Sequence, residues 1–281
     1  MTIKTILITG ANSGFGKAVA TAALNAGHQV IGTVRQEGSR KEFESLVPGR
    51  SKSFILDVSD FEAVEPMVKD ISKACGPIDV LINNAGYGHE GILEESPLRE
   101  LQRQFEVNVF GAVAMIKAVL PAMRLRRSGH IINITSMGGF ITMPGISYYC
   151  GSKFAMEGIS DALAKEVAPF GIKVTAVAPG SFRTDWAGRS MVRSDRAIAD
   201  YDELFNPIRQ ARIEKSGKQN GDPAKLAQVL LRLTELENPP THLLLGSDAL
   251  HLVRERLTLF ADELKRLEDL TVSTDITQKP A

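Results

Sequence analysis

The alternation of short apolar runs with helical segments most constrains how this chain can fold. Ile3–Thr9 is β-branched and apolar, and an alanine-rich helical run that ends at Gly27 follows it. The alternation continues to about residue 180 through five further apolar runs, at His28–Val34, Lys52–Leu56, Ile78–Asn83, His130–Thr135 and Ile172–Ala178. Strands separated by helices need crossover connections, which produce a parallel sheet. The sequence therefore predicts an α/β fold.

Helices are expected between these strands, and the pattern stops after Pro179. The predicted helices span Phe61–Ala74, Leu98–Arg127 and Ser147–Phe170, with a tolerated kink at Pro121 in the second. Beyond Pro179 the chain is polar and arginine-rich, with aromatic residues among the charges. We expect residues of about 182–220 to leave the sheet as a mobile lid insertion.

The C-terminal part returns to the regular pattern. Asp222-Pro223 restarts a helix with an acidic N-cap, Thr241–Leu245 is a last short strand, and a charged helix covers about 248–269. The length permits two domains at ~150 residues each, but one large domain fits equally well. We expect one domain over 1–270, a Rossmann-like doubly wound parallel sheet of about seven strands with helices on both faces, and a loose tail at 271–281.

Two motifs lie where a parallel sheet places its ligand-binding loops. Thr9-Gly10-Ala11-Asn12-Ser13-Gly14-Phe15-Gly16 follows the first strand and opens the first helix. Glycines permit a sharp turn and a close approach to a pyrophosphate, whose charge meets the helix amides and dipole. Asn83-Asn84-Ala85-Gly86 closes the fourth strand. Taken singly, each motif is also compatible with a simple turn.

Ser136, Tyr149 and Lys153 form the most informative group. Tyr149 and Lys153 are four residues apart, so their side chains share one helix face. A nearby ammonium stabilises a phenolate, so we expect Lys153 to lower the pKa of Tyr149 from ~10 toward neutrality. Ser136, at a strand end, is placed to hydrogen-bond a substrate oxygen. Standing alone, the Tyr and Lys would be read as a surface pair on an amphipathic helix.

Charge and composition argue against several classes. Lys+Arg and Asp+Glu both number 33, so no global field favours nucleic acid. Uninterrupted apolar runs such as Ala112–Ile116 are far shorter than the ~20 residues that span a bilayer, and Met1–Gly10 lacks a signal-peptide pattern. The two cysteines and five histidines show no disulfide or metal-ligand spacing. We expect a cytoplasmic protein without nucleic-acid, membrane or metal partners.

Taken in order, the motifs resemble those of the short-chain dehydrogenase/reductase family over residues 3–250. The glycine motif is similar to its TGxxxGxG, NNAG to its fourth-strand motif, and Tyr149–Lys153 to its YxxxK. Ser136 precedes Tyr149 by 13 residues, and Asn108 matches the fourth catalytic position. The resemblance implies that Tyr149 donates and accepts the proton, Ser136 orients a carbonyl, Lys153 binds ribose and tunes Tyr149, and Asn108 holds a water that leads to Lys153.

The resemblance also implies a cofactor site and subunit contacts. The expected cofactor-binding residues are Gly10, Asn12, Ser13, Gly14, Phe15, Gly16, Arg35, Asp57, Asn83, Ala85, Gly86, Tyr149, Lys153, Pro179, Gly180, Phe182 and Thr184. Asp57 is expected at the adenine ring, although it could instead cap the following helix. The helices from Leu98 and Ser147 are expected to pair between subunits of a homodimer or homotetramer.

The implied activity is hydride transfer between NADP(H) and a carbonyl or secondary alcohol, as in a ketoreductase. Apolar residues between Ser136 and Tyr149 favour a hydrophobic ketone or alcohol; they are Met137, Ile141, Met143 and Ile146. Tyr148 and Cys150 are interpreted as packing residues, and His89 as a solvated loop residue. The alternatives are an epimerase or dehydratase on the same fold and a non-enzymatic dinucleotide-sensing protein.

The end of the second strand predicts which nicotinamide cofactor is used. NAD-binding versions of this fold place a carboxylate there, on the adenine ribose hydroxyls. Here Thr33-Val34-Arg35 lacks the carboxylate and supplies a cation. Arg35 can hold a 2′-phosphate through paired charge-assisted hydrogen bonds, which favours NADP(H). The alternative is that Glu37 reaches the ribose.

Arg35→Ala is expected to raise KM for NADPH roughly tenfold to a hundredfold, because ~1.5 to 3 kcal/mol of charged hydrogen bonding is lost. KM for NADH should barely change. Steady-state rates with each cofactor measure both values. An equal rise in KM for the two cofactors, or a preference of the wild-type enzyme for NADH, would contradict the assignment.

Overall fold

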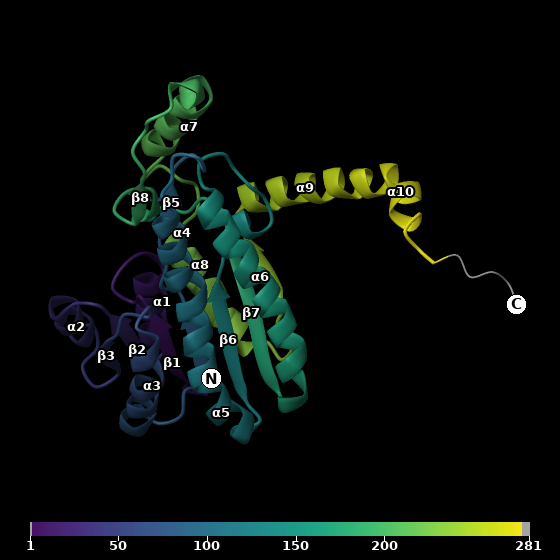
Figure 1. Ribbon diagram of the computed structural model, residues 1–281. Coiled ribbons are helices and arrows are strands. Elements are labelled where there is room, and N and C mark those ends of the chain that lie inside the picture. The colour runs from purple at the N-terminus through teal and green to yellow at the C-terminus, as the bar shows by residue number, and fades with distance from the viewer. Residues whose placement is uncertain (1, 277–281) are drawn as a thin grey trace, which may run out of the picture.

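The computed structural model describes residues 2–276, in which a parallel sheet lies between two layers of helices (Figure 1). Within this range the sheet has seven strands in the order β3-β2-β1-β4-β6-β7-β9, which confirms the predicted doubly wound fold. Between β1 and β4 the direction of winding reverses, and sheets of this class bind ligands at such a point. The strands are β1 Thr5–Thr9, β2 Gln29–Val34, β3 Ser51–Ile55, β4 Val80–Asn83, β6 Gly129–Ile134, β7 Ile172–Pro179 and β9 His242–Leu245.

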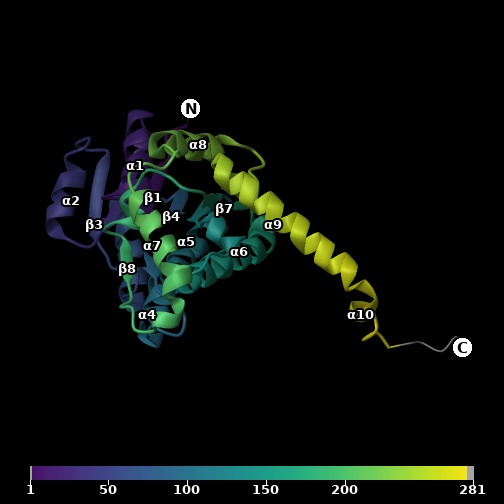
Figure 2. The ribbon, with the colours of Figure 1, turned by 90° about the horizontal axis from the view of Figure 1, so that it is seen from above.

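The two faces of the sheet bury alternate residues of each strand. In β1, Ile6 and Ile8 belong to the core beneath helices α1 and α8, whereas Leu7 belongs to the core beneath α3, α5 and α6. The two helical layers are distinct when the molecule is seen from above (Figure 2). Both faces are covered, so the strands read as continuous apolar runs. The helices are α1 Gly14–Asn25, α2 Glu37–Glu44, α3 Phe61–Cys75, α6 Ser147–Val167 and α8 Pro223–Glu235.

The segment expected as one helix from Leu98 to Arg127 is divided by a turn of π-helix. Helix α4 spans Leu98–Phe105, the π-helical turn spans Glu106–Gly111, and α5 spans Ala112–Arg126. The interruption therefore spans Glu106–Gly111 and is not at Pro121, which lies inside α5. By length and composition alone Leu98–Arg126 is apolar enough to cross a membrane, but its buried side chains pack in the core under the sheet.

Residues 182–220 leave the sheet, as predicted, and fold over the carboxyl ends of the strands (Figure 1). We call them the cap. Its strand β8, Met191–Arg193, pairs in parallel with β5, Gly88–Glu90, and its helix α7 spans Asp202–Glu214. The fully buried Glu90 carboxylate binds three cap arginines, Arg193, Arg209 and Arg212. The cap is thus a folded element, and its movement as a lid stays a prediction.

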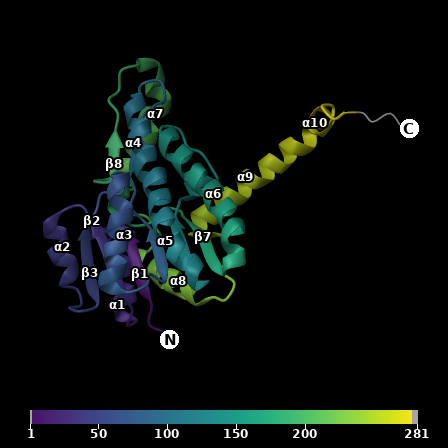
Figure 3. The same cartoon turned by 60° about the horizontal axis from the view of Figure 1, so that its bottom comes forward.

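Helices α9, Ser247–Arg266, and α10, Glu268–Val272, form an arm that projects from the body (Figure 3). We call them the C-terminal arm. The charged helix predicted at about 248–269 is thereby divided at Leu267. The start predicted for a loose tail, residue 271, is too early, because Thr271 and Val272 belong to α10. Residues 277–281 lie outside the described residues.

Candidate active site

The glycine-rich turn between β1 and α1 adopts backbone conformations that favour glycine. Gly10 has φ of +64° and Gly14 has φ of +51°. A Cβ at Gly10 would lie 3.1 Å from the Cα of Ala85, so glycine lets the loop after β4 approach. Within the described residues, the Ser13 side chain caps no amide of α1, and Gly14–Lys17 contains no acidic residue. The free amides and positive dipole end fit an anion such as a pyrophosphate.

The loop after β4 holds this turn in place. The Oγ1 of Thr9 accepts hydrogen bonds from the backbone N–H of Asn84 and of Ala85, both at 3.0 Å. Asn84 Nδ2 donates to the carbonyls of Thr9 and Gly10 at 2.9 and 3.0 Å. Thr9 and Asn84 had no predicted role, although both stand inside the two motifs. Asn83 Nδ2 instead donates to Asn133 Oδ1 at 2.9 Å, so this end of the side chain is engaged inside the sheet.

Arg35 and Asp57 stand at the ends of the neighbouring strands β2 and β3. Arg35 is exposed to solvent. Burial by itself would raise the pKa of Asp57, but hydrogen bonds from Ser59 and the charge of Arg35 hold that pKa below its ordinary value. Asp60, rather than Asp57, caps α3, so the capping alternative for Asp57 is wrong. The two charges are left at the edge where an adenine ribose is expected.

The segment after β7 lies beside the glycine-rich turn. The rings of Phe182 and Phe15 meet edge to face, with centroids 5.3 Å apart. A Cβ at Gly14 would lie 3.9 Å from the Thr184 side chain. The residues expected at the pyrophosphate and those expected at the nicotinamide, Pro179–Thr184, therefore converge at one edge of the sheet.

Asp248 at the base of the C-terminal arm shapes the same segment. Its Oδ2 accepts a hydrogen bond from the Ser181 backbone N–H at 2.8 Å. Gly180 packs so closely against this carboxylate that any Cβ there would collide with it. Sequence reasoning missed this role, because Asp248 looks like any acidic residue at the start of a charged helix.

Tyr149, Lys153 and Ser136 come together, as predicted. Ser136 lies close enough to the Tyr149 phenol to lower its pKa in part. A Cβ at Gly138 would lie 3.4 Å from both Ser136 Oγ and Tyr149 Cε1, which places the two side chains next to each other. The Lys153 ammonium lies 5.7 Å from the Tyr149 ring centroid and donates to the carbonyl of Ile134 at 2.9 Å. Tyr149 and Lys153 are each only 7% exposed, so both act in a desolvated environment.

Asn108 joins this group from the π-helical turn. Its Nδ2 donates to the Tyr87 carbonyl at 3.0 Å and to Ser152 Oγ at 3.2 Å, and its Oδ1 accepts from the Tyr87 N–H at 3.1 Å. Ser152 in turn donates to the Tyr149 carbonyl at 2.7 Å. Asn108 thus ties the loop after β4 to α6, and π-helical turns are frequent at functional positions. The water expected beside it stays a prediction.

Burial controls the protonation of the two titratable groups. It raises the pKa of Tyr149, and it lowers the pKa of Lys153 to about 8. The expectation that the ammonium lowers the pKa of Tyr149 is wrong for the cofactor-free protein, because desolvation of the phenolate dominates. Tyr149 is consequently protonated near neutral pH and can serve as a proton donor.

A buried carboxylate behind Lys153 was not anticipated. Glu157, one helical turn farther along α6, accepts a hydrogen bond from Thr135 and lies 2.7 Å from His242 Nδ1. Burial raises the pKa of Glu157, and its charge partly opposes the lowering of the Lys153 pKa. The sequence carries no signal for this network, since His242 is 85 residues away and arrives on β9.

An apolar surface surrounds Tyr149 on the side of the cap. Ile146, Tyr149 and Cys150 form a buried cluster against which Met143 and Trp186 pack. The Trp186 and Tyr149 ring centroids are 4.9 Å apart. Of the four residues expected in the wall, Met143 and Ile146 lie in this cluster, and the cap adds Trp186. That the cluster is a substrate wall stays a prediction.

Tyr148 points away from this site. Its hydroxyl donates to the Ser96 carbonyl at 2.8 Å, and its ring stacks on His89 with centroids 4.9 Å apart. Tyr148 is thus a packing residue, as expected. The expectation of a solvated His89 is wrong: it is buried and lies 2.9 Å from Ser194 Oγ, because β8 of the cap covers it.

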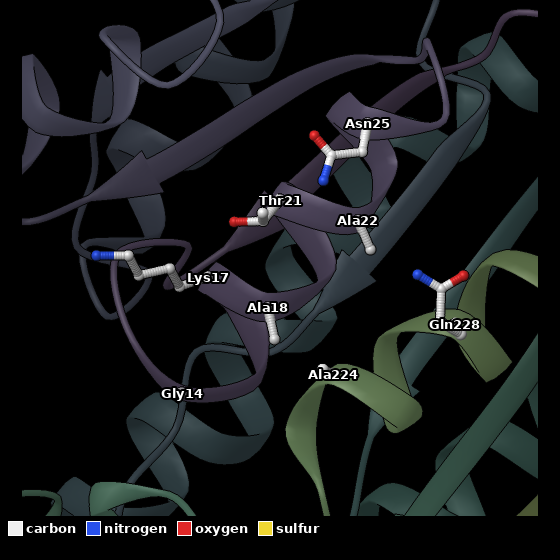
Figure 4. Close-up of a pocket in the computed structure, with 8 residues that line it drawn as sticks. All are labelled: Gly14, Lys17, Ala18, Thr21, Ala22, Asn25, Ala224 and Gln228. Atoms are coloured by element: carbon white, nitrogen blue, oxygen red, sulfur yellow. The ribbon is translucent and has the colours of Figure 1, made fainter.

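A cavity of about 400 Å³ lies between the outer faces of α1 and α8 (Figure 4). Its lining residues are Gly14, Lys17, Ala18, Thr21, Ala22, Asn25, Ala224 and Gln228. It meets the glycine-rich turn only at Gly14, and none of the expected catalytic residues lines it. It is therefore separate from the site around Tyr149.

The sheet, the glycine cradle and the Ser–Tyr–Lys group define a nicotinamide-dependent oxidoreductase. Residues 4–193 match the model of the short chain dehydrogenase family, and the chain belongs to that family. A 3-ketodihydrosphingosine reductase from Bacteroides thetaiotaomicron is 43% identical over 237 residues, which cover 84% of this chain and 85% of the relative.

Solved structures agree with this assignment. A short-chain dehydrogenase from Streptomyces avermitilis has a TM-score of 0.91 and 40% identity, with 98% of this chain and 100% of that chain covered. The structure of ElxO with NADP bound has a TM-score of 0.72 and 28% identity, and the match covers 86% of this chain and 96% of that chain. The protein is an NADP(H)-dependent oxidoreductase of carbonyl and alcohol groups, which the comparisons favour over an epimerase or a dinucleotide sensor.

Tyr149→Phe is expected to lower kcat by about 100-fold or more, the range of general acid–base catalysis, because it removes the proton donor. Tyr148→Phe is the matched control and should keep kcat within a few-fold, since that hydroxyl bonds Ser96. Initial rates of NADPH oxidation give kcat, and fluorescence titration should show unchanged NADPH binding. A Tyr149→Phe enzyme with near wild-type kcat would end the assignment.

Lys153→Met tests the effect of burying an ammonium. A lysine whose pKa is lowered on folding destabilises the folded protein below that pKa, and the effect fades as pH rises from about 8 to 10.5. At pH 7 the cofactor-free variant should therefore be more stable by roughly 2 kcal/mol, and it should be inactive. Urea unfolding at pH 7 and pH 10 measures this. The argument would be contradicted if Lys153→Met raised the free energy of unfolding equally at both pH values, or lowered it at pH 7.

Proposed function

We propose that this enzyme uses NADPH to reduce ketone groups of hydrophobic substrates, with Tyr149 as the proton donor. The observation that carries the proposal is the burial of a protonated Tyr149 between Ser136 and an apolar wall that includes Trp186. A general acid must be protonated at the working pH and within reach of the oxygen it serves. Tyr149 meets the first condition, and Ser136 marks where that oxygen binds.

In the proposed reaction, NADPH supplies a hydride to the carbonyl carbon. Tyr149 gives its phenolic proton to the carbonyl oxygen, so the C=O bond becomes a secondary alcohol, and the phenolate is later reprotonated from solvent. Ser136 Oγ holds the oxygen beside the phenol. The Lys153 ammonium stabilises the phenolate that remains, and Asn108 fixes α6 at the correct distance from the loop after β4.

The proposed cofactor contacts follow the edge of the sheet. The glycine-rich turn holds the pyrophosphate, Arg35 holds the 2′-phosphate, and Asp57 lies at the adenine. Residues Pro179–Thr184 hold the nicotinamide carboxamide. The convergence of these segments at the carboxyl ends of the strands supports the assignment.

Substrate class is proposed from the wall of the site. Met143, Ile146 and Trp186 offer apolar contact next to Tyr149. The 43% identical relative is named for a 3-keto derivative of dihydrosphingosine, a long-chain amino alcohol, which supports a hydrophobic ketone here.

We further propose that the enzyme acts in the cytoplasm as a homodimer or homotetramer, without nucleic-acid or membrane partners. Phe110 in the π-helical turn and Phe154 in α6 are 51% and 44% exposed, which supports pairing of the helices from Leu98 and Ser147 with a second copy. The zero formal net charge supports the absence of nucleic acid.

A substrate panel tests the proposed class. Long-chain 3-ketones should exceed small polar keto acids in kcat/KM by about tenfold or more with NADPH, because the buried apolar area contributes ~25 cal/mol per Å². Trp186→Ala should reduce this preference, and Leu204→Ala, at an exposed position of the cap outside the cluster around Tyr149, is the control. The class is refuted when small hydroxy acids or keto acids turn over best.

A further inference from the structure

The C-terminal arm presents an apolar surface that the other residues of 2–276 do not cover. Its base is anchored, since Ala249 and Val253 are buried and Asp248 binds Ser181. Every residue of 254–266 is exposed, and two views show the arm leaving the body (Figures 2 and 3). Isolated helices of this length are marginally stable in water. The arm is therefore expected to pack on something.

Five apolar residues of α9, together with Leu267 just after its end, follow a heptad pattern. They recur at alternating intervals of three and four at Leu250, Val253, Leu257, Phe260, Leu264 and Leu267. This is the spacing of the a and d positions of a coiled coil. Val253 packs on the chain's own body, whereas Leu257 and Leu264 are 58% and 53% exposed. We call this line of residues the seam; it begins at the body and continues along the exposed arm.

We propose that the arm pairs with the arm of a second copy of this chain as an antiparallel two-stranded coiled coil. A two-fold axis between Leu257 and Phe260 sets Leu257 of each copy against Phe260 of the other. The same axis sets Leu250 against Leu267. It also sets Leu264 against Val253, which is already buried on its own body, so the two Leu257–Phe260 layers carry the contact. The contact closes on itself as an isologous interface.

Charges beside the seam select the antiparallel direction. Arg256 and Glu263 occupy equivalent flanking positions one heptad apart, and the antiparallel register brings Arg256 of each copy to Glu263 of the other. In a parallel pair, Arg256 of one copy would face Ala261 of the other, so this charge pairing would be lost. The Arg256 guanidinium already lies 5.2 Å from the Phe260 ring centroid, at the edge of the seam.

The charge of the arm disfavours a lipid surface as its partner. From Arg254 to Asp269 the arm carries four basic and five acidic residues. Helices that lie on membranes are rich in Lys and Arg on their polar face. A mixed face suits a second copy, and its contact is separate from the one proposed for the helices from Leu98 and Ser147. The two contacts together would give a tetramer.

The first experiment compares two leucines of equal exposure. Leu257 lies in the seam and Leu259, at 59% exposure, lies outside it. Leu257→Glu should halve the particle mass of the full-length enzyme in analytical ultracentrifugation at micromolar concentration, whereas Leu259→Glu should leave the mass unchanged. Circular dichroism melting shows whether both variants stay folded. A mass that Leu257→Glu leaves unchanged, or that both variants lower equally, overturns the proposal.

The second experiment tests the direction of pairing. Arg256→Glu and Glu263→Arg should each weaken self-association at least tenfold, and the double variant should restore it, because the charges are exchanged across the axis. Absence of rescue overturns the antiparallel register. Flotation with phosphatidylcholine vesicles, with and without phosphatidylserine, addresses lipid. Vesicle binding that Leu257→Glu abolishes while the particle mass stays the same would assign the seam to a membrane and overturn the proposal.

Discussion

The structure depends on the hydrogen bonds that join the loop after β4 to the glycine-rich turn after β1. Thr9 Oγ1 accepts from two consecutive backbone amides, and the Asn84 side chain donates to two consecutive carbonyls. These bonds satisfy buried backbone groups at the edge where the winding of the sheet reverses. They leave the amides at the start of α1 free to face an anion, so the cofactor cradle is preorganised by the sheet itself.

The proposed catalytic group is built by burial at that edge. Asn108 ties the same loop to α6, and this carries Tyr149 and Lys153 into a position where they are desolvated together. Desolvation disfavours the charged form of both groups, so the phenol stays protonated and the pKa of the Lys153 ammonium is lowered. The charge of the neighbouring Glu157 carboxylate partly opposes this lowering of the Lys153 pKa. Burying these groups destabilises the free protein, and it places the proposed proton donor in a desolvated environment.

The cap and the base of the C-terminal arm both contact the edge of the sheet where its strands end, but they make different contributions there. The cap is fixed by the buried Glu90 and its arginines, and it brings Trp186 onto Tyr149. The arm begins with Asp248, which shapes the segment expected at the nicotinamide, and then leaves the body with an apolar seam. Through Asp248, the base of a surface helix is in direct contact with the proposed cofactor site.

The sequence by itself determined the parallel α/β fold, the glycine-rich turn and the identity of Ser136, Tyr149 and Lys153, because periodicity and short spacings are local properties of the chain. Tertiary structure decided what depends on contacts between distant segments. The sign of the Tyr149 pKa shift, the buried His89, the interruption of the helix at Glu106–Gly111 and the Glu157–His242 pair are of this kind. Desolvation and charge pairing arise only when the sheet brings such residues together, and no spacing along one chain encodes them.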